Sequence, residues 1–125
     1  MKLLLTGTTG YIGKKTAEFL VKSGHEVHSL IRKLPDSTNM SKENIQYHLI
    51  TQSSIKDIVC NVKPDIVIHI ASKFLAAHDY DDVEDLISSN ITFPTQLLDA
   101  MCLAGVENFI NTGTSWQHYN SATYS

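Results

Sequence analysis

Three glycines follow the first apolar segment of the chain, each three residues after the last. Residues 2–5 are short, apolar and typical of a buried strand, which ends at Thr6 and Gly7. Gly10 and Gly13 come next, where apolar residues begin to recur at helical spacing. A glycine-rich turn between a strand and a helix lets the backbone approach a phosphate closely, and the helix N-terminus supplies free N–H groups. The sequence therefore predicts a phosphate-binding turn at its beginning.

Strands and helices alternate along the rest of the chain. Apolar stretches predict strands at residues 2–7, 25–32, 45–50, 65–72 and 106–114. Helical spacing predicts helices at residues 11–23 and 54–61, and one or two helical segments at 79–104. This alternation is typical of a parallel sheet with right-handed crossovers, and near-continuous apolar strands indicate that both faces are covered. We therefore expect an α/β fold, the doubly wound parallel sheet or Rossmann fold, with five strands and flanking helices.

Composition limits the classes of partner. The 125 residues suit one domain, and the net charge of −3 does not favour nucleic acid or an acidic membrane surface. No apolar run approaches the roughly 20 residues of a membrane span, so a reducing cytoplasm is the expected compartment. Cys60 and Cys102 are expected to be buried, unreactive thiols on helices. The six histidines are scattered, and we expect no metal site.

Four segments together resemble one enzyme family. The turn reads TGTTGYIG, residues 65–72 read DIVIHIAS, residues 89–101 read SNITFPTQLLDAM and residues 106–115 read VENFINTGTS. In this order they resemble the extended short-chain dehydrogenase/reductase family, of the nucleotide-sugar epimerase/dehydratase type. The stretch NTGTSWQHY is most similar to sugar ketoreductases of the CDP-abequose synthase type. The resemblance covers essentially the whole chain and implies an N-terminal NAD(P)-binding Rossmann domain at residues 1–125, without a C-terminal substrate-binding part.

The resemblance implies a set of cofactor-binding residues. They lie in the turn, after the second and fourth strands and in the fifth: Gly7, Thr9, Gly10, Tyr11, Ile12, Gly13, Arg32, Ile70, Ala71, Ser72 and Thr112. Ile31 stands where NAD-preferring relatives carry Asp, and Arg32 and Lys33 can reach a 2′-phosphate, so NADP is favoured over NAD. Residues 50–53 hold no acid for the adenine amino group, which leaves Gln52 or a backbone group for that contact.

The resemblance also implies hydride transfer at a carbonyl of a nucleotide-sugar substrate. Thr114 matches the hydroxyl that binds the substrate oxygen, and Asn90 matches an Asn that kinks its helix and helps to bind a water in a proton relay. The family's Tyr-x-x-x-Lys pair has no match here, because Tyr119 is followed at the fourth position by Thr123 and no Lys comes after Lys73. We therefore expect the first part of a longer enzyme, either shortened or naturally short, with no turnover alone.

Two other functions remain open, together with the state of assembly. A non-catalytic dinucleotide-binding sensor or regulatory module would explain the missing Tyr and Lys. A flavin-reductase or quinone-sensing relative would share the glycine spacing and Arg32, although the segment at 89–101 favours the sugar branch. Five strands alone would leave an apolar face and edge uncovered, and we expect a homo-oligomer.

Overall fold

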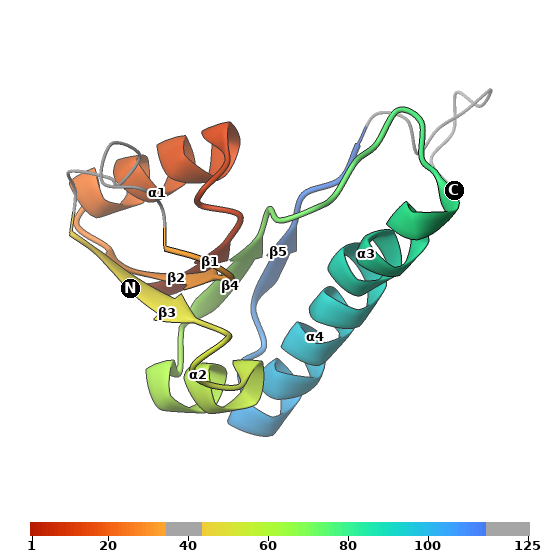
Figure 1. The fold of residues 1–125 in the computed structure, drawn as a ribbon. Coiled ribbons are helices and arrows are strands. Elements are labelled where there is room, and N and C mark those ends of the chain that lie inside the picture. The colour runs from red at the N-terminus through yellow and green to blue at the C-terminus, as the bar shows by residue number, and fades with distance from the viewer. Residues whose placement is uncertain (35–43, 115–125) are drawn as a thin grey trace, which may run out of the picture.

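Five parallel strands form one sheet in the computed structural model, which describes residues 1–34 and 44–114 (Figure 1). The strands are β1 (Lys2–Thr6), β2 (Glu26–Ile31), β3 (Ile45–Leu49), β4 (Ile66–His69) and β5 (Phe109–Asn111). Their spatial order is β3-β2-β1-β4-β5, so the chain winds outward from β1 in one direction and then crosses to the other side of β1. The predicted doubly wound Rossmann architecture is confirmed.

Helices follow the strands as the periodicity predicts. They are α1 (Tyr11–Lys22), α2 (Ile55–Val62), the 3-10 helix η1 (Tyr80–Asp82), α3 (Val83–Ile87), the π-helix η2 (Ser88–Thr92) and α4 (Phe93–Ala104). The last four run on without a break between them, so the segments expected at 79–104 form one long helical rod, visible in Figure 1. Gly105 ends the rod in the left-handed region, at a φ of 69°, as a glycine there allows.

Alternate residues of the strands face two separate cores. Leu4 of β1 and Val67 of β4 pack with α2 and α4 on one face. Leu3 and Leu5 of β1 pack on the opposite face with Ala17 of α1. Figure 1 shows α1 on one side of the sheet and α2 and α4 on the other. Both faces of β1 are therefore buried, which is why this strand reads as an unbroken apolar run.

The fourth and fifth strands are shorter than the sequence predicts. The fourth strand was expected over 65–72 but ends at His69, because the N–H groups of Ile70 and Ala71 turn to the Thr6 hydroxyl, each at 3.1 Å. β5 pairs only with β4, through Phe109 to Asn111, so the short β4 limits it to three residues instead of 106–114.

The expectation that both cysteines are buried is wrong. Cys102 is exposed and Cys60 is half-buried. Cys102 follows the buried Met101 on α4, and one step along a helix turns the side chain away from the sheet toward solvent.

Residues 1–34 and 44–114 show neither a cluster of metal ligands nor a membrane-spanning helix. No group of three or more His, Cys, Asp or Glu side chains in these ranges is arranged to hold a metal ion. No helix there has the length and apolar character needed to cross a bilayer.

A buried histidine joins the ends of the two central strands. His69 of β4 is 6% exposed, and its Nδ1 lies 2.8 Å from the Oγ1 of Thr6 at the end of β1. That oxygen already accepts the two backbone N–H groups after β4, so the hydroxyl donates its proton and Nδ1 accepts. Burial lowers the pKa of His69 below its ordinary value of 6.5, and burial followed by the charge of His28 lowers the pKa of His48.

We predict that the protein loses stability as the pH falls below about 6.5. Between the lowered pKa values and 6.5 the unfolded chain binds more protons than the folded chain, so the free energy of unfolding rises with pH in this window. Urea unfolding at several pH values between 5 and 7.5 measures how the free energy of unfolding depends on pH. A His69→Gln variant is expected to show a shallower pH slope, and a His78→Gln variant controls for removing one histidine. A free energy of unfolding that is constant from pH 7.5 to 5 would contradict the prediction.

Candidate functional site

A cavity of about 560 Å³ opens at the carboxyl edge of the sheet, where the strand order reverses between β1 and β4. Open α/β sheets bind ligands at such a point, and the volume lies within the roughly 300–1,000 Å³ of small-molecule sites. Ten of the eleven residues predicted to bind a cofactor line this cavity: Gly7, Thr9, Gly10, Tyr11, Ile12, Gly13, Arg32, Ile70, Ala71 and Ser72. The tertiary structure thus brings together three segments that the sequence holds far apart.

Two of the three glycines are required by the protein itself. Gly7 has a φ of +76°, and a Cβ there would lie 2.7 Å from the backbone N of Ala71. A Cβ on Gly13 would lie 2.1 Å from the carbonyl oxygen of Gly7, an overlap with backbone that no rotamer relieves. At Gly10 the nearest atom would be 3.4 Å away, which is ordinary contact. Packing within the protein therefore does not require glycine at position 10, and the missing side chain instead keeps the space beside the turn free.

The N-terminus of α1 faces this open space. Gly10 caps the helix without a side-chain hydrogen bond, and the first turn holds no acidic residue. The turn itself is closed by the N–H of Gly10, which donates to the carbonyl of Gly7 at 3.0 Å. Free N–H groups with the positive end of a helix dipole attract anions, so this arrangement fits a phosphate group.

Hydroxyl groups fix the turn to the neighbouring strands. Thr6 binds the backbone after β4, as described above, and this holds Ile70 and Ala71 against the glycine turn. The hydroxyl of Thr8 is hydrogen-bonded to the hydroxyl of Ser29 on β2, and both side chains are buried. The walls of the cavity are thereby pre-formed by buried polar contacts rather than by exposed loops alone.

The sequence analysis missed a second group of lining residues. They come from the carboxyl ends of β2 and β3, from α2 and from the helical rod: Leu30, Ile31, Ile50, Ile55, Ser88, Ser89, Thr92, Phe93 and Gln96. Strand-end positions could have been predicted from the fold alone, but the approach of the rod is decided by its packing on the sheet. Gln52, considered for an adenine contact, is not among the lining residues, whereas the apolar Ile50 and Ile55 are.

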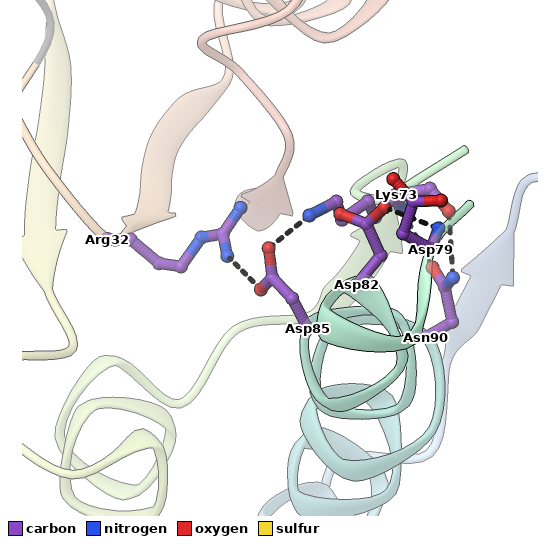
Figure 2. A network of polar contacts seen from close by, with 6 residues as sticks. All are labelled: Arg32, Lys73, Asp79, Asp82, Asp85 and Asn90. Atoms are coloured by element: carbon purple, nitrogen blue, oxygen red, sulfur yellow. Dashed lines mark hydrogen bonds and ion pairs between the residues drawn. The ribbon is translucent and has the colours of Figure 1, made fainter. Parts of the chain in front are cut away.

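Arg32 lies at the rim, directly after β2, and its side chain is 72% exposed. A guanidinium Nη1 lies 3.9 Å from an Oδ1 of Asp85 on α3, and the other oxygen of Asp85 pairs with the Nζ of Lys73. The hydrogen bond and charge of Lys73, with a smaller contribution from Arg32, lower the pKa of Asp85, so this carboxylate is charged at neutral pH. Figure 2 shows Asp85 between the two cations.

Asn90 holds the segment after β4. Its Oδ1 accepts the N–H of Lys73 and its Nδ2 donates to the carbonyl of Lys73, both at 2.8 Å (Figure 2). The residue lies in η2, where the widened helical turn departs from α geometry. The kink expected at Asn90 stays a prediction. One amide hydrogen and one lone pair remain for another partner such as water.

The two threonines after β5 occupy different positions. Thr112 is not among the cavity-lining residues, and both its N–H and its hydroxyl donate to the carbonyl of His69, at 3.0 and 3.2 Å. Thr114 is exposed, three residues beyond the end of β5 at the same edge of the sheet. Ser115, Tyr119 and Tyr124 lie outside the described residues.

Comparisons with known proteins agree on one family. The model of the NAD dependent epimerase/dehydratase family matches residues 3–121. A CDP-abequose synthase of Yersinia pseudotuberculosis is 29% identical over 119 residues, which are 94% of this chain and 41% of that protein. A UDP-glucose 4-epimerase sequence of Klebsiella pneumoniae is 30% identical over 120 residues, with 88% of this chain and 86% of that sequence covered.

A solved structure shares the fold over nearly the whole chain. The structure titled MoeE5 in complex with UDP-glucose and NAD matches with a TM-score of 0.78 and 21% identity, covering 98% of this chain and 39% of that one. At this identity the match shows the fold alone. The chain spans about two fifths of the length of MoeE5 and of the CDP-abequose synthase.

We predict that alanine at Gly13 lowers the stability of the fold, whereas alanine at Gly10 mainly weakens ligand binding. Gly13→Ala is expected to lower the free energy of unfolding by at least about 2 kcal/mol, because its Cβ meets backbone. Gly10→Ala is expected to change it by less than about 0.5 kcal/mol, since its Cβ meets open space, and to weaken binding of a dinucleotide instead. Urea unfolding and calorimetric titration measure the two effects. Equal destabilisation by both substitutions would contradict this division of roles.

Proposed function

Because the chain belongs to the NAD dependent epimerase/dehydratase family, we propose that it binds a nicotinamide dinucleotide and forms the cofactor-binding part of an enzyme that acts on nucleotide sugars. The observation that carries the proposal is the cavity at the switch point of the sheet, walled by the glycine turn and the N-terminus of α1. Open space at Gly10 beside an uncapped helix end fits a pyrophosphate.

Different residues around the cavity would contact different parts of the proposed cofactor. Gly10 and the first turn of α1 would hold the pyrophosphate, Arg32 would lie beside the adenosine ribose, and Ile70 and Ala71 would lie under the nicotinamide half. Side chains of the rod such as Phe93 line the cavity from the α4 side and would contact the bound cofactor. When bound, the nicotinamide supplies the acceptor or donor of a hydride.

We further propose that the cavity binds NADP in preference to NAD. Ile31 has no carboxylate to bind the ribose hydroxyls, and Arg32 is exposed at the rim of the cavity where a 2′-phosphate would lie. A guanidinium binds phosphate in a bidentate manner. Of the cations that the structure describes near this rim, Arg32 is the one that lines the cavity, so its substitution tests the preference directly.

The substrate is proposed from the family and from two side chains. Relatives of this chain are named for their action on UDP-glucose and for CDP-abequose synthesis. Thr114 would donate its hydroxyl to the sugar oxygen at which hydride transfer occurs. Asn90 would act as a positioning residue: it fixes the main chain at Lys73 and keeps one N–H and one lone pair for a water.

Assembly and compartment complete the proposal. Leu98 and Leu103 are 43% and 60% exposed on α4, and Ile110 is 51% exposed on the edge strand β5. Exposed apolar side chains on one helix favour association, and a homo-oligomer covers them. Cys60 and Cys102 are free thiols, which suits the reducing cytoplasm that we propose as the compartment.

We predict that the purified chain binds NADPH more tightly than NADH. Titration with each dinucleotide, followed by nicotinamide fluorescence and calorimetry, measures both affinities. Arg32→Gln is expected to weaken NADPH about tenfold and to leave NADH nearly unchanged, because a charge-assisted phosphate contact contributes on the order of 1.5 kcal/mol. Lys15→Gln is the control, since it removes an exposed cation of α1 that does not line the cavity. Binding of neither dinucleotide would contradict the proposed function, and equal loss of both in Arg32→Gln would contradict only the NADP preference.

We also predict that the chain is a dimer or larger in solution. Light scattering after size-exclusion chromatography measures the mass. Leu103→Glu is expected to shift the protein toward monomer, because it places a charge on the apolar surface of α4. Phe19→Glu, on the 68%-exposed side chain of α1, is the control for a new charge elsewhere. A monomer at high concentration would overturn the prediction.

A further inference from the structure

One acidic side chain stands between the two cations at the rim of the cavity. Asp85 comes from α3, Arg32 from the end of β2 and Lys73 from the segment after β4. Figure 2 shows the three side chains in a row, with Asp85 in the middle. Because β2 and β4 are the two neighbours of β1, the row connects the strands that flank the glycine turn. We call these three residues the rim triad.

The rim triad adjoins the cavity through Arg32 and through residues next to Lys73 and Asp85. Arg32 itself lines the cavity, and so do Ser72, which precedes Lys73, and Ser88 and Ser89, one turn of helix after Asp85. An anion bound beside Arg32 would therefore approach the carboxylate of Asp85, which lies 3.9 Å from the guanidinium.

The other polar groups near the rim are engaged elsewhere or support the triad. Asp82 accepts the N–H of Asp79 at 3.0 Å, which fixes the start of the helical rod (Figure 2). Asn90 binds both backbone polar groups of Lys73, which holds the base of that lysine in place. Lys73 is 26% exposed, against 72% for Arg32. Asp85 is thus anchored on the lysine side, and its contact with Arg32 is the looser one.

Charge at the rim depends on this carboxylate. The rim triad carries one net positive charge with Asp85 ionised, and would carry two without it. A phosphate monoester such as the 2′-phosphate of NADP carries about −1.5 to −2 charges at neutral pH. It competes with Asp85 for Arg32 and is repelled by Asp85, whereas a ribose with free hydroxyls carries no charge and meets neither effect.

We propose that Asp85 is a specificity-determining residue, which acts through Arg32 to lower the affinity for a phosphorylated adenosine ribose relative to an unphosphorylated one. The proposal rests on the proposed dinucleotide function and deepens it. Arg32 supplies the attraction for the 2′-phosphate, and Asp85 limits it, so the chain discriminates less strongly between NADPH and NADH than an unopposed arginine would. Asp85 is a positioning residue here and takes no part in the chemical step.

The test compares Asp85→Asn with the unchanged chain by titration with NADPH and NADH at low salt. Asp85→Asn is expected to tighten NADPH binding about two- to tenfold and to leave NADH binding within about twofold, because the substitution removes both the competing exposed ion pair and the repulsion of the phosphate. Glu84→Gln is the matched control, since it removes the same charge from the neighbouring position on α3 but lies outside the rim triad. Circular dichroism and the melting temperature of each variant verify folding.

A double substitution separates this role from a general charge effect. In an Arg32→Gln background the gain in NADPH affinity from Asp85→Asn is expected to disappear, because the competition requires the guanidinium. The gain is also expected to shrink at high salt. Three results would overturn the proposal: an unchanged ratio of NADPH to NADH affinity in Asp85→Asn, weaker NADPH binding in that variant, or the same gain in NADPH affinity in Glu84→Gln. In each of these cases, binding of NADH would still uphold the proposed function. Failure of the unchanged chain to bind either dinucleotide would overturn both.

Discussion

The close approach of α1 to the turn after β1 is the constraint on which the site depends. A Cβ at Gly13 would lie 2.1 Å from the Gly7 carbonyl, and a Cβ at Gly7 would lie 2.7 Å from the backbone of Ala71. Two absent side chains thus bring three backbone segments together at the centre of the sheet. Only this contact allows the N-terminus of α1 to face the space between β1 and β4, where a phosphate can be held by N–H groups alone.

Polar contacts then hold the second wall in place. Thr6 accepts two N–H groups from the segment after β4 and donates to the neutral ring of His69, so the end of β4 is fixed to the end of β1. Asn90 fixes the same segment from the other side through Lys73. The segment between these two clamps also carries Ile70, Ala71 and Ser72, which line the cavity. A wall held by hydrogen bonds at both of its ends needs little rearrangement when a ligand binds, which favours affinity.

Sequence reasoning recovered most of the site because it lies where the fold places all such sites. Strand and helix periodicity predicted the sheet, and the family resemblance placed Gly7, Arg32 and Ala71 at the cofactor, where they line the cavity. It was wrong about Cys102, since a periodicity with many apolar residues does not distinguish the two sides of α4. It placed Thr112 at the cofactor, whereas the structure turns that hydroxyl toward the His69 carbonyl. The roles of Thr114 and Asn90 in the reaction remain proposals.

What the sequence by itself determined is local. The glycine spacing, the unbroken apolar strands and Gly105 as a helix end follow from steric rules that act over a few neighbouring residues. The tertiary structure alone decided which distant charges meet, and the rim triad is the main case. Arg32, Lys73 and Asp85 have no pattern that relates them, and they meet because β2 and β4 end at one edge of the sheet and α3 lies beside that edge. Long-range electrostatic contacts depend on distance in space, which no local pattern encodes.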